Sequence, residues 1–120
     1  MPAAVIGQSL AGEPVTQPLQ SLTLIVVIKP ACDGCRDFVH SDLAELSLVP
    51  VIIVSAQPDL NGEWAGARQR VIVAPEVLAD LDIRWPPCYV LVDPVGQRIV
   101  TEGVVFNAAQ VAVEIAPFLV

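Results

Sequence analysis

Short apolar runs constrain the fold of this chain more than any other feature of its sequence. The longest central run covers the seven positions 22–28 and is interrupted only by Thr23, and the runs over 51–54 and 89–92 are shorter. A membrane-spanning helix needs about 20 apolar residues in succession, so we expect no membrane span in this chain. Because the runs are rich in Val and Ile, they predict strands buried in a sheet that is covered on both faces.

The composition fits one folded domain and excludes several partners. The chain has 120 residues, and we expect a single domain over residues 1–120. Hydrophobic residues make up 54% of it and charged residues only 16%, so its apolar surface is large enough to offset the cost of ordering the chain. The net charge is −7 and no Lys or Arg cluster occurs. We therefore expect no nucleic acid and no anionic membrane surface as a partner.

The first half of the chain predicts a hairpin, a strand, a helix and a second strand. Residues 1–20 carry two glycine-containing turn signals, so we expect an N-terminal arm with a small hairpin. A strand over 22–28 follows, and apolar residues then recur at helical spacing over 35–46. The next strand covers 51–54. This strand–helix–strand unit predicts two parallel strands joined by a right-handed crossover.

The second half predicts a loop, two short elements, a hairpin and a last helix. In chain order these are a loop over 55–70, an edge strand or extended arm over 71–73, a short helix over 75–81, strands over 89–92 and 98–104, and a helix from the N-cap Asn107 to about Leu119. All elements together predict a central mixed sheet with helices on both faces. The expected fold class is a three-layer α/β/α sandwich.

Cys32 and Cys35 form a Cys-x-x-Cys pair between the strand over 22–28 and the helix that follows. At a helix N-terminus, unpaired backbone N–H groups and the helix dipole favour an anion, so this position favours the thiolate of Cys32. The thiolate is the nucleophile in disulfide exchange, and Cys35, one turn later, is within reach to close a disulfide. Asp33 acts in the opposite direction because its carboxylate disfavours a neighbouring thiolate.

Three segments stand in the order found in a known family: Leu24-Ile-Val-Val-Ile-Lys-Pro-Ala-Cys-Asp-Gly-Cys-Arg36, Trp85-Pro-Pro-Cys-Tyr-Val-Leu-Val-Asp-Pro-Val-Gly96 and Ile99-Val-Thr-Glu-Gly103. They resemble the active-site strand and loop, the cis-proline segment and the glycine-ended strand of thioredoxin-fold proteins, and most of all the TlpA-like or redoxin group of thiol–disulfide oxidoreductases. The resemblance covers nearly the whole chain. It implies a thioredoxin-like three-layer sandwich in which residues 1–20 form an N-terminal hairpin extension.

The resemblance also implies an enzyme that exchanges a dithiol and a disulfide with a protein partner. Cys32 would attack and Cys35 would resolve the mixed disulfide, while a second redox protein donates or accepts electrons. No cofactor and no metal are required for this chemistry.

The segment before the strand over 89–92 supplies the substrate-binding residues that the resemblance implies. Pro87 matches the family's cis proline, although Pro86 also fits, and the backbone near Cys88 would pair with a strand of the partner. Trp85 either flanks the substrate groove or packs against the fold.

Departures from the family pattern leave a second function open. Ala31 stands where the family has a Trp, Lys29 and Pro30 replace an aromatic residue, and the strand over 22–28 lacks the buried carboxylate of thioredoxins. The dithiol is intact, so a specialised exchanger is favoured over a general protein-reducing thioredoxin. The alternative is a non-catalytic binding or adaptor module that uses the groove near Pro87.

The third cysteine, Cys88, leaves further alternatives. It can act as a third redox thiol, as a regulatory thiol or as a small packing residue. A metal carrier would use Cys32, Cys35 and Cys88, but zinc or iron–sulfur ligation needs about four ligands. The remaining candidate, His40, follows Cys35 by five residues, and we expect it on the helix surface instead.

The sequence gives two expectations for the compartment. Residues 1–20 lack the basic start and the apolar stretch of a secretory signal, which predicts a cytoplasmic protein as the chain stands. The family resemblance implies instead an extracytoplasmic domain whose signal or anchor was removed.

Overall fold

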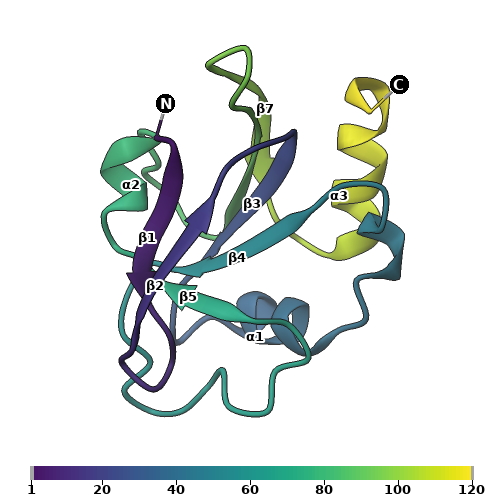
Figure 1. The fold of residues 1–120 in the computed structure, drawn as a ribbon. Coiled ribbons are helices and arrows are strands. Elements are labelled where there is room, and N and C mark those ends of the chain that lie inside the picture. The colour runs from purple at the N-terminus through teal and green to yellow at the C-terminus, as the bar shows by residue number, and fades with distance from the viewer. Residues whose placement is uncertain (1, 120) are drawn as a thin grey trace.

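A seven-stranded mixed sheet lies at the centre of the structure, a computed structural model that describes residues 2–119 (Figure 1). Its strands are β1 (Ala4–Gln8), β2 (Pro14–Pro18), β3 (Thr23–Ile28), β4 (Val51–Ser55), β5 (Val71–Val73), β6 (Cys88–Asp93) and β7 (Arg98–Val104). The order across the sheet is β2-β1-β5-β4-β3-β6-β7. The neighbours β3, β4 and β5 run parallel, and the other pairs are antiparallel.

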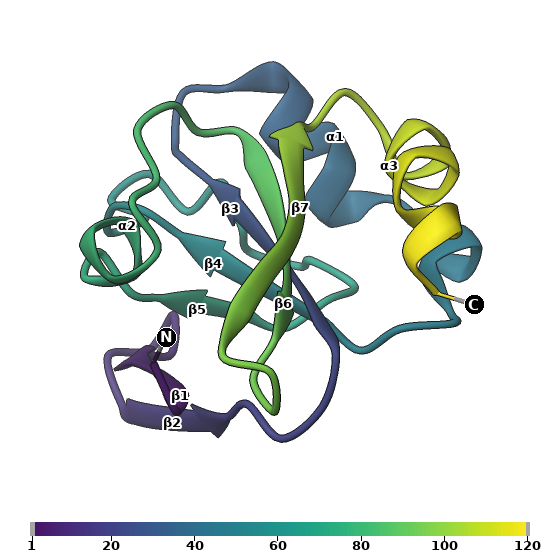
Figure 2. The ribbon, with the colours of Figure 1, turned by 90° about the horizontal axis from the view of Figure 1, so that it is seen from above.

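Helices cover both faces of this sheet, as the sequence predicts for a three-layer fold. They are α1 (Asp33–His40), α2 (Val77–Asp80) and α3 (Ala108–Ile115), with 3-10 turns η1 (Ala44–Leu46) and η2 (Ala116–Phe118). Figure 2 shows α2 on one side of the sheet and α1 with α3 on the other. Within residues 2–119, no helix has the length and apolar character needed to cross a membrane.

The central strand β3 is buried along its whole length because it faces an apolar core on each side. Leu24 and Val26 belong to the core under α1 and α3, whereas Ile25 and Val27 belong to the core under α2. This explains why its sequence is continuously apolar rather than alternating. The parallel pairing of β3 with β4 and the β6–β7 hairpin are confirmed.

The helix predicted over 35–46 is wrong in its second half. α1 ends at His40, and Ser41 takes an extended conformation with φ −82° and ψ 164°. The Ser41 hydroxyl donates to the Phe38 carbonyl at 2.7 Å, and the Asp42 carboxylate accepts from the Ala44 amide at 2.9 Å. These side chains offer the backbone local partners other than a continued helix. The apolar spacing continues only through the separate turn η1.

The strand β5 is not at an edge of the sheet, contrary to one reading of the sequence. The predicted N-terminal hairpin forms from β1 and β2 and adds to β5, where Gln8 lies opposite Val73. Gly7 makes this junction possible, since a Cβ there would overlap the Val73 carbonyl oxygen and lie 2.8 Å from the Ala74 Cβ. The strands at the edges are β2 and β7.

The last helix begins as predicted and is held to the sheet by a tyrosine. Asn107 caps α3 in a capping box with Gln110, and the helix gives way to the Pro-containing turn η2 after Ile115. The hydroxyl of buried Tyr89 donates to Glu114 Oε1 at 2.6 Å. Across the strand pair, a Cβ at Gly103 would come within 2.8 Å of the Tyr89 hydroxyl oxygen, so the glycine leaves room for the ring.

Replacing Gly7 by Ala tests the junction between the hairpin and β5. The new methyl group would meet backbone atoms that cannot move without opening the β1–β5 contact. We expect the free energy of unfolding to fall by about 1–3 kcal/mol. Gly34 is the control, because nothing lies within 4 Å of a Cβ there, and Ala in a helix is favoured over Gly by about 1 kcal/mol. Urea denaturation of both variants should give opposite signs; equal stability of Gly7→Ala and wild type would contradict this account.

Candidate functional site

The paired cysteines lie where β3 ends and α1 begins. Cys32 is the N-cap of α1, with φ −132° and ψ 110°, and its Sγ accepts a hydrogen bond from the Cys35 amide at 3.2 Å. The Cys32 carbonyl accepts from the Arg36 amide at 3.1 Å. A sulfur atom therefore occupies the position of a capping oxygen, at the end of the helix where backbone N–H groups favour negative charge.

The two thiols differ in their exposure to solvent. Cys35 is fully buried beside Phe38 and Val39, whereas Cys32 is half-buried. Burial, together with its hydrogen bond with Cys32, raises the pKa of Cys35 to about 12. Lys29 acts in the opposite direction on the same thiol. The arrangement thus leaves Cys32 partly open to solvent and keeps Cys35 protonated behind it.

Two charged residues in the first turn of α1 form an ion pair next to the cysteines. Arg36 Nη2 lies 2.6 Å from Asp33 Oδ1 in an exposed ion pair. The carboxylate that follows Cys32 is therefore partly offset by the guanidinium that follows Cys35. An exposed pair of this kind contributes little to stability, so its effect is on the local charge around Cys32.

An unforeseen carboxylate contacts the backbone in front of Cys32. Ala31 has φ +61°, and its amide donates to both oxygens of Glu63 at 2.9 and 3.1 Å. His40, expected on the helix surface, is instead half-buried, with Nε2 at 3.1 Å from the Glu63 carbonyl oxygen. The loop over 55–70 has no periodic pattern, and no local signal in the sequence points to Glu63.

The proline segment precedes β6, on the far side of β3 from β4. The Pro86–Pro87 peptide bond is cis, as the resemblance implied for Pro87. The Pro87 carbonyl accepts from the Val105 amide at 3.3 Å. Cys88 is the first residue of β6, where it lies opposite Val27 of β3 and Val104 of β7. The backbone of Cys88 is therefore already part of the sheet.

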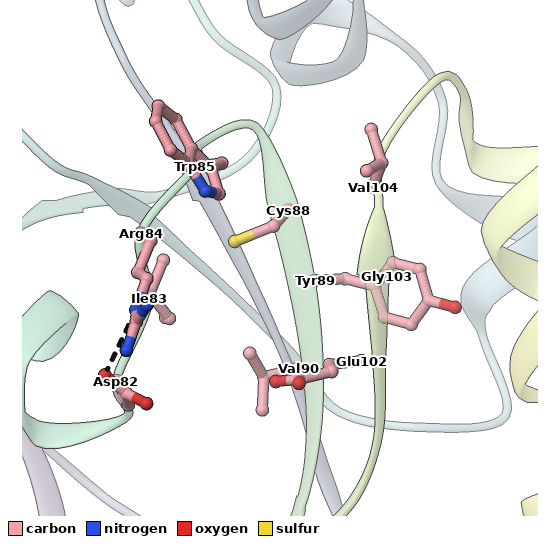
Figure 3. Close-up of a pocket in the computed structure, with 10 residues that line it drawn as sticks. All are labelled: Asp82, Ile83, Arg84, Trp85, Cys88, Tyr89, Val90, Glu102, Gly103 and Val104. Carbon is pink, nitrogen blue, oxygen red and sulfur yellow. Dashed lines mark ion pairs between the residues drawn. The ribbon is translucent and has the colours of Figure 1, made fainter.

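Trp85 and Cys88 line a cleft of about 350 Å³ beside this segment (Figure 3). Trp85 is 83% exposed, so it does not pack in the core. Figure 3 shows Cys88 directed toward Trp85, while Tyr89 points to the other side of β6. Burial raises the pKa of Cys88 to about 11, and the charge of Glu102 contributes.

The third cysteine lies on the opposite face of the sheet from the pair. Cys88 packs against the core under α2, whereas Cys32 and Cys35 belong to the core under α1 and α3. Among the residues described, 2–119, no three His, Cys, Asp or Glu side chains are grouped to hold a metal ion. A metal carrier that uses all three cysteines receives no support from this arrangement.

The mixed sheet, a Cys-x-x-Cys pair at the start of α1 and a cis proline before β6 together define the thioredoxin fold. The chain is similar to StoA from Bacillus subtilis, with a TM-score of 0.67, 15% identity, and coverage of 93% of this chain and 96% of that one. It is also similar to the thioredoxin domain of a thiol-disulfide oxidoreductase from Bacteroides vulgatus, with a TM-score of 0.67, 20% identity, and coverage of 98% and 94%.

A third solved structure extends this likeness. It is a putative thiol:disulfide interchange protein DsbE from Chlorobium tepidum, with a TM-score of 0.69, 17% identity, and coverage of 98% of this chain and 94% of that one. No family model and no curated protein sequence matches the chain. The likeness therefore shows a thioredoxin-like α/β fold.

The different environments of the thiols predict the order in which they react. At pH 7, iodoacetamide should label Cys32 first, because the raised pKa values of Cys35 and Cys88 leave almost none of either thiol ionised. Between about pH 8 and pH 10, labelling of Cys35 and Cys88 should rise by roughly tenfold per pH unit. Peptide mass spectrometry of timed samples measures this. The Cys32→Ser variant should lose the fast phase, and fast labelling of Cys35 at pH 7 would contradict the assignment.

Proposed function

We propose that this chain is a thiol–disulfide oxidoreductase that exchanges the Cys32–Cys35 dithiol and disulfide with a protein partner. The observation that carries the proposal is the position of Cys32 Sγ as the N-cap of α1, at 3.2 Å from the Cys35 amide. Two of the similar solved structures are described as a thiol-disulfide oxidoreductase and a putative thiol:disulfide interchange protein, which supports the same chemistry for this site.

The exchange proceeds through a mixed disulfide. The Cys32 thiolate attacks one sulfur of the partner's disulfide, a bond forms between them, and the partner's other sulfur leaves as a thiolate. Cys35 then loses its proton and attacks Cys32 Sγ, which closes the Cys32–Cys35 disulfide and releases the partner's second thiolate. Two electrons pass to the partner, and the reverse sequence oxidises a dithiol partner. A second redox protein resets the pair.

The partner docks beside the proline segment in this proposal. Pro86 and Pro87 lack a backbone N–H, and the Pro87 carbonyl is already occupied by Val105. The Pro86 carbonyl is thus the acceptor that this dipeptide offers to a strand of the partner. The exposed ring of Trp85 flanks the same segment and supplies apolar contact area.

Substitution of each cysteine separates attack from resolution. Cys32→Ser should abolish insulin reduction, because it removes the nucleophile, whereas Cys35→Ser should accumulate a mixed disulfide that non-reducing electrophoresis detects. The matched control is Ser47→Ala, at an exposed position after η1, which should retain wild-type activity.

A redox titration decides between this proposal and the adaptor module. The wild-type pair should titrate as one two-electron couple between about −350 and −100 mV. An adaptor, which the replacement of the family Trp by Ala31 would favour, forms no reversible Cys32–Cys35 disulfide in this range. That result would overturn the proposed enzyme function.

A further inference from the structure

We infer that Glu63 is a positioning residue for the nucleophile, because its carboxylate fixes the backbone N–H of Ala31, the residue directly before Cys32. Both oxygens of Glu63 accept from the Ala31 N–H, at 2.9 and 3.1 Å. This inference rests on the proposed exchange reaction. It assigns a role to a residue that lies 32 positions away from its partner along the chain.

We call the two hydrogen bonds from the Ala31 amide to Glu63 the clamp, and the conformation of Ala31 explains why they are needed. Its φ of +61° lies in the left-handed region, which residues with a Cβ disfavour. A backbone in that conformation persists only when its surroundings hold it there. The bonds to Glu63 hold the amide at this point, so the chain enters α1 with Cys32 in the N-cap position.

Glu63 lies in a short segment, residues 59–64, which we call the strap. Hydrogen bonds within the strap hold Glu63 in place. The Asp59 carboxylate accepts from the amides of Glu63 at 2.7 Å and Trp64 at 2.9 Å. Trp64 is fully buried, and its indole Nε1–H donates to Ser55 Oγ at the end of β4 at 3.2 Å. The clamp on Ala31 is therefore anchored in the core of the domain rather than carried by a free loop.

The strap also reaches the other end of α1. His40, the last residue of the helix, places Nε2 at 3.1 Å from the Glu63 carbonyl oxygen. One residue thus contacts the chain just before α1 through its side chain and the last turn of α1 through its backbone. A shift of α1 relative to the loop before it would break one of these contacts.

The consequence for the reaction concerns geometry at Cys32 Sγ. Without the clamp, the peptide unit between Pro30 and Ala31 is free to rotate about φ of Ala31, and the Cys32 sulfur leaves the position where it accepts from the Cys35 amide. Attack on a partner disulfide then starts from a smaller fraction of aligned molecules. The negative charge of Glu63 also acts on the Cys32 thiolate. The experiment must therefore distinguish the effect of the hydrogen bonds to Ala31 from the effect of the charge.

Two variants of equal charge make this distinction. Glu63→Gln removes the charge but keeps one oxygen that can accept from Ala31, whereas Glu63→Ala removes both. We measure the second-order rate of mixed-disulfide formation with a disulfide-containing peptide at pH 7, and the reduction potential of the pair. Loss of a hydrogen bond to a neutral acceptor corresponds to about fivefold, so Glu63→Ala should be about fivefold slower than Glu63→Gln.

Controls separate positioning from folding. Urea denaturation must show both variants folded at the assay temperature, and the Ala31 amide should exchange with solvent faster in Glu63→Ala than in Glu63→Gln by NMR. Glu45→Ala, at an exposed carboxylate on η1, should react at the wild-type rate.

The outcomes distinguish the two proposals. Equal rates within about twofold for Glu63→Ala and Glu63→Gln, with a wild-type pair that titrates normally, overturn the positioning role alone. A wild-type pair that forms no reversible disulfide overturns the proposed function and this inference together. Any larger separation, with similar stability of the two variants, supports the positioning role.

Discussion

The hydrogen bond from the Cys35 amide to Cys32 Sγ, at 3.2 Å, depends on where β3 delivers the chain. β3 is buried between two apolar cores, so its direction is set by packing on both faces. Phe38 and Val39 then seat α1 on one of these cores. Because packing fixes both β3 and α1, only residues 29–32 connect them, and the last of these, Cys32, becomes the N-cap of α1. Hydrophobic packing away from the cysteines thus places the Cys32 sulfur.

The same sheet separates the thiols of the chain. Cys35 is enclosed on the α1 face, which raises its pKa, and Cys88 projects to the α2 face beside Trp85. Alternation along β6 explains this, since Tyr89 follows Cys88 and points to the opposite side. Cys88 directly follows the cis proline, yet its side chain belongs to a different core from Cys32 and Cys35. A place next to the proline segment therefore does not bring a side chain beside the pair.

Local signals in the sequence predicted the parts of the fold that depend on local physics. The buried strands, the cap at Asn107 and the Cys32–Cys35 pair before a helix follow from residue type and spacing over a few positions. The interior place of β5 and the clamp by Glu63 depend on contacts between distant segments, which no periodicity encodes. The burial of Trp64 belongs to the same group, because its surroundings in the sequence read only as an irregular loop.

The proline segment and the exposed Trp85 beside it bear on how a partner is recognised in the proposed reaction. Strand pairing in most complexes uses alternating donors and acceptors on both chains, but the dipeptide Pro86–Pro87 offers no donor. Backbone pairing at this point can therefore supply only part of the affinity, and the exposed Trp85 and the charges around Cys32 must supply the rest. Since such contacts depend on side-chain shape, they discriminate between partners more strongly than main-chain pairing does. In the proposed reaction, this favours a dedicated partner over general reduction of exposed disulfides.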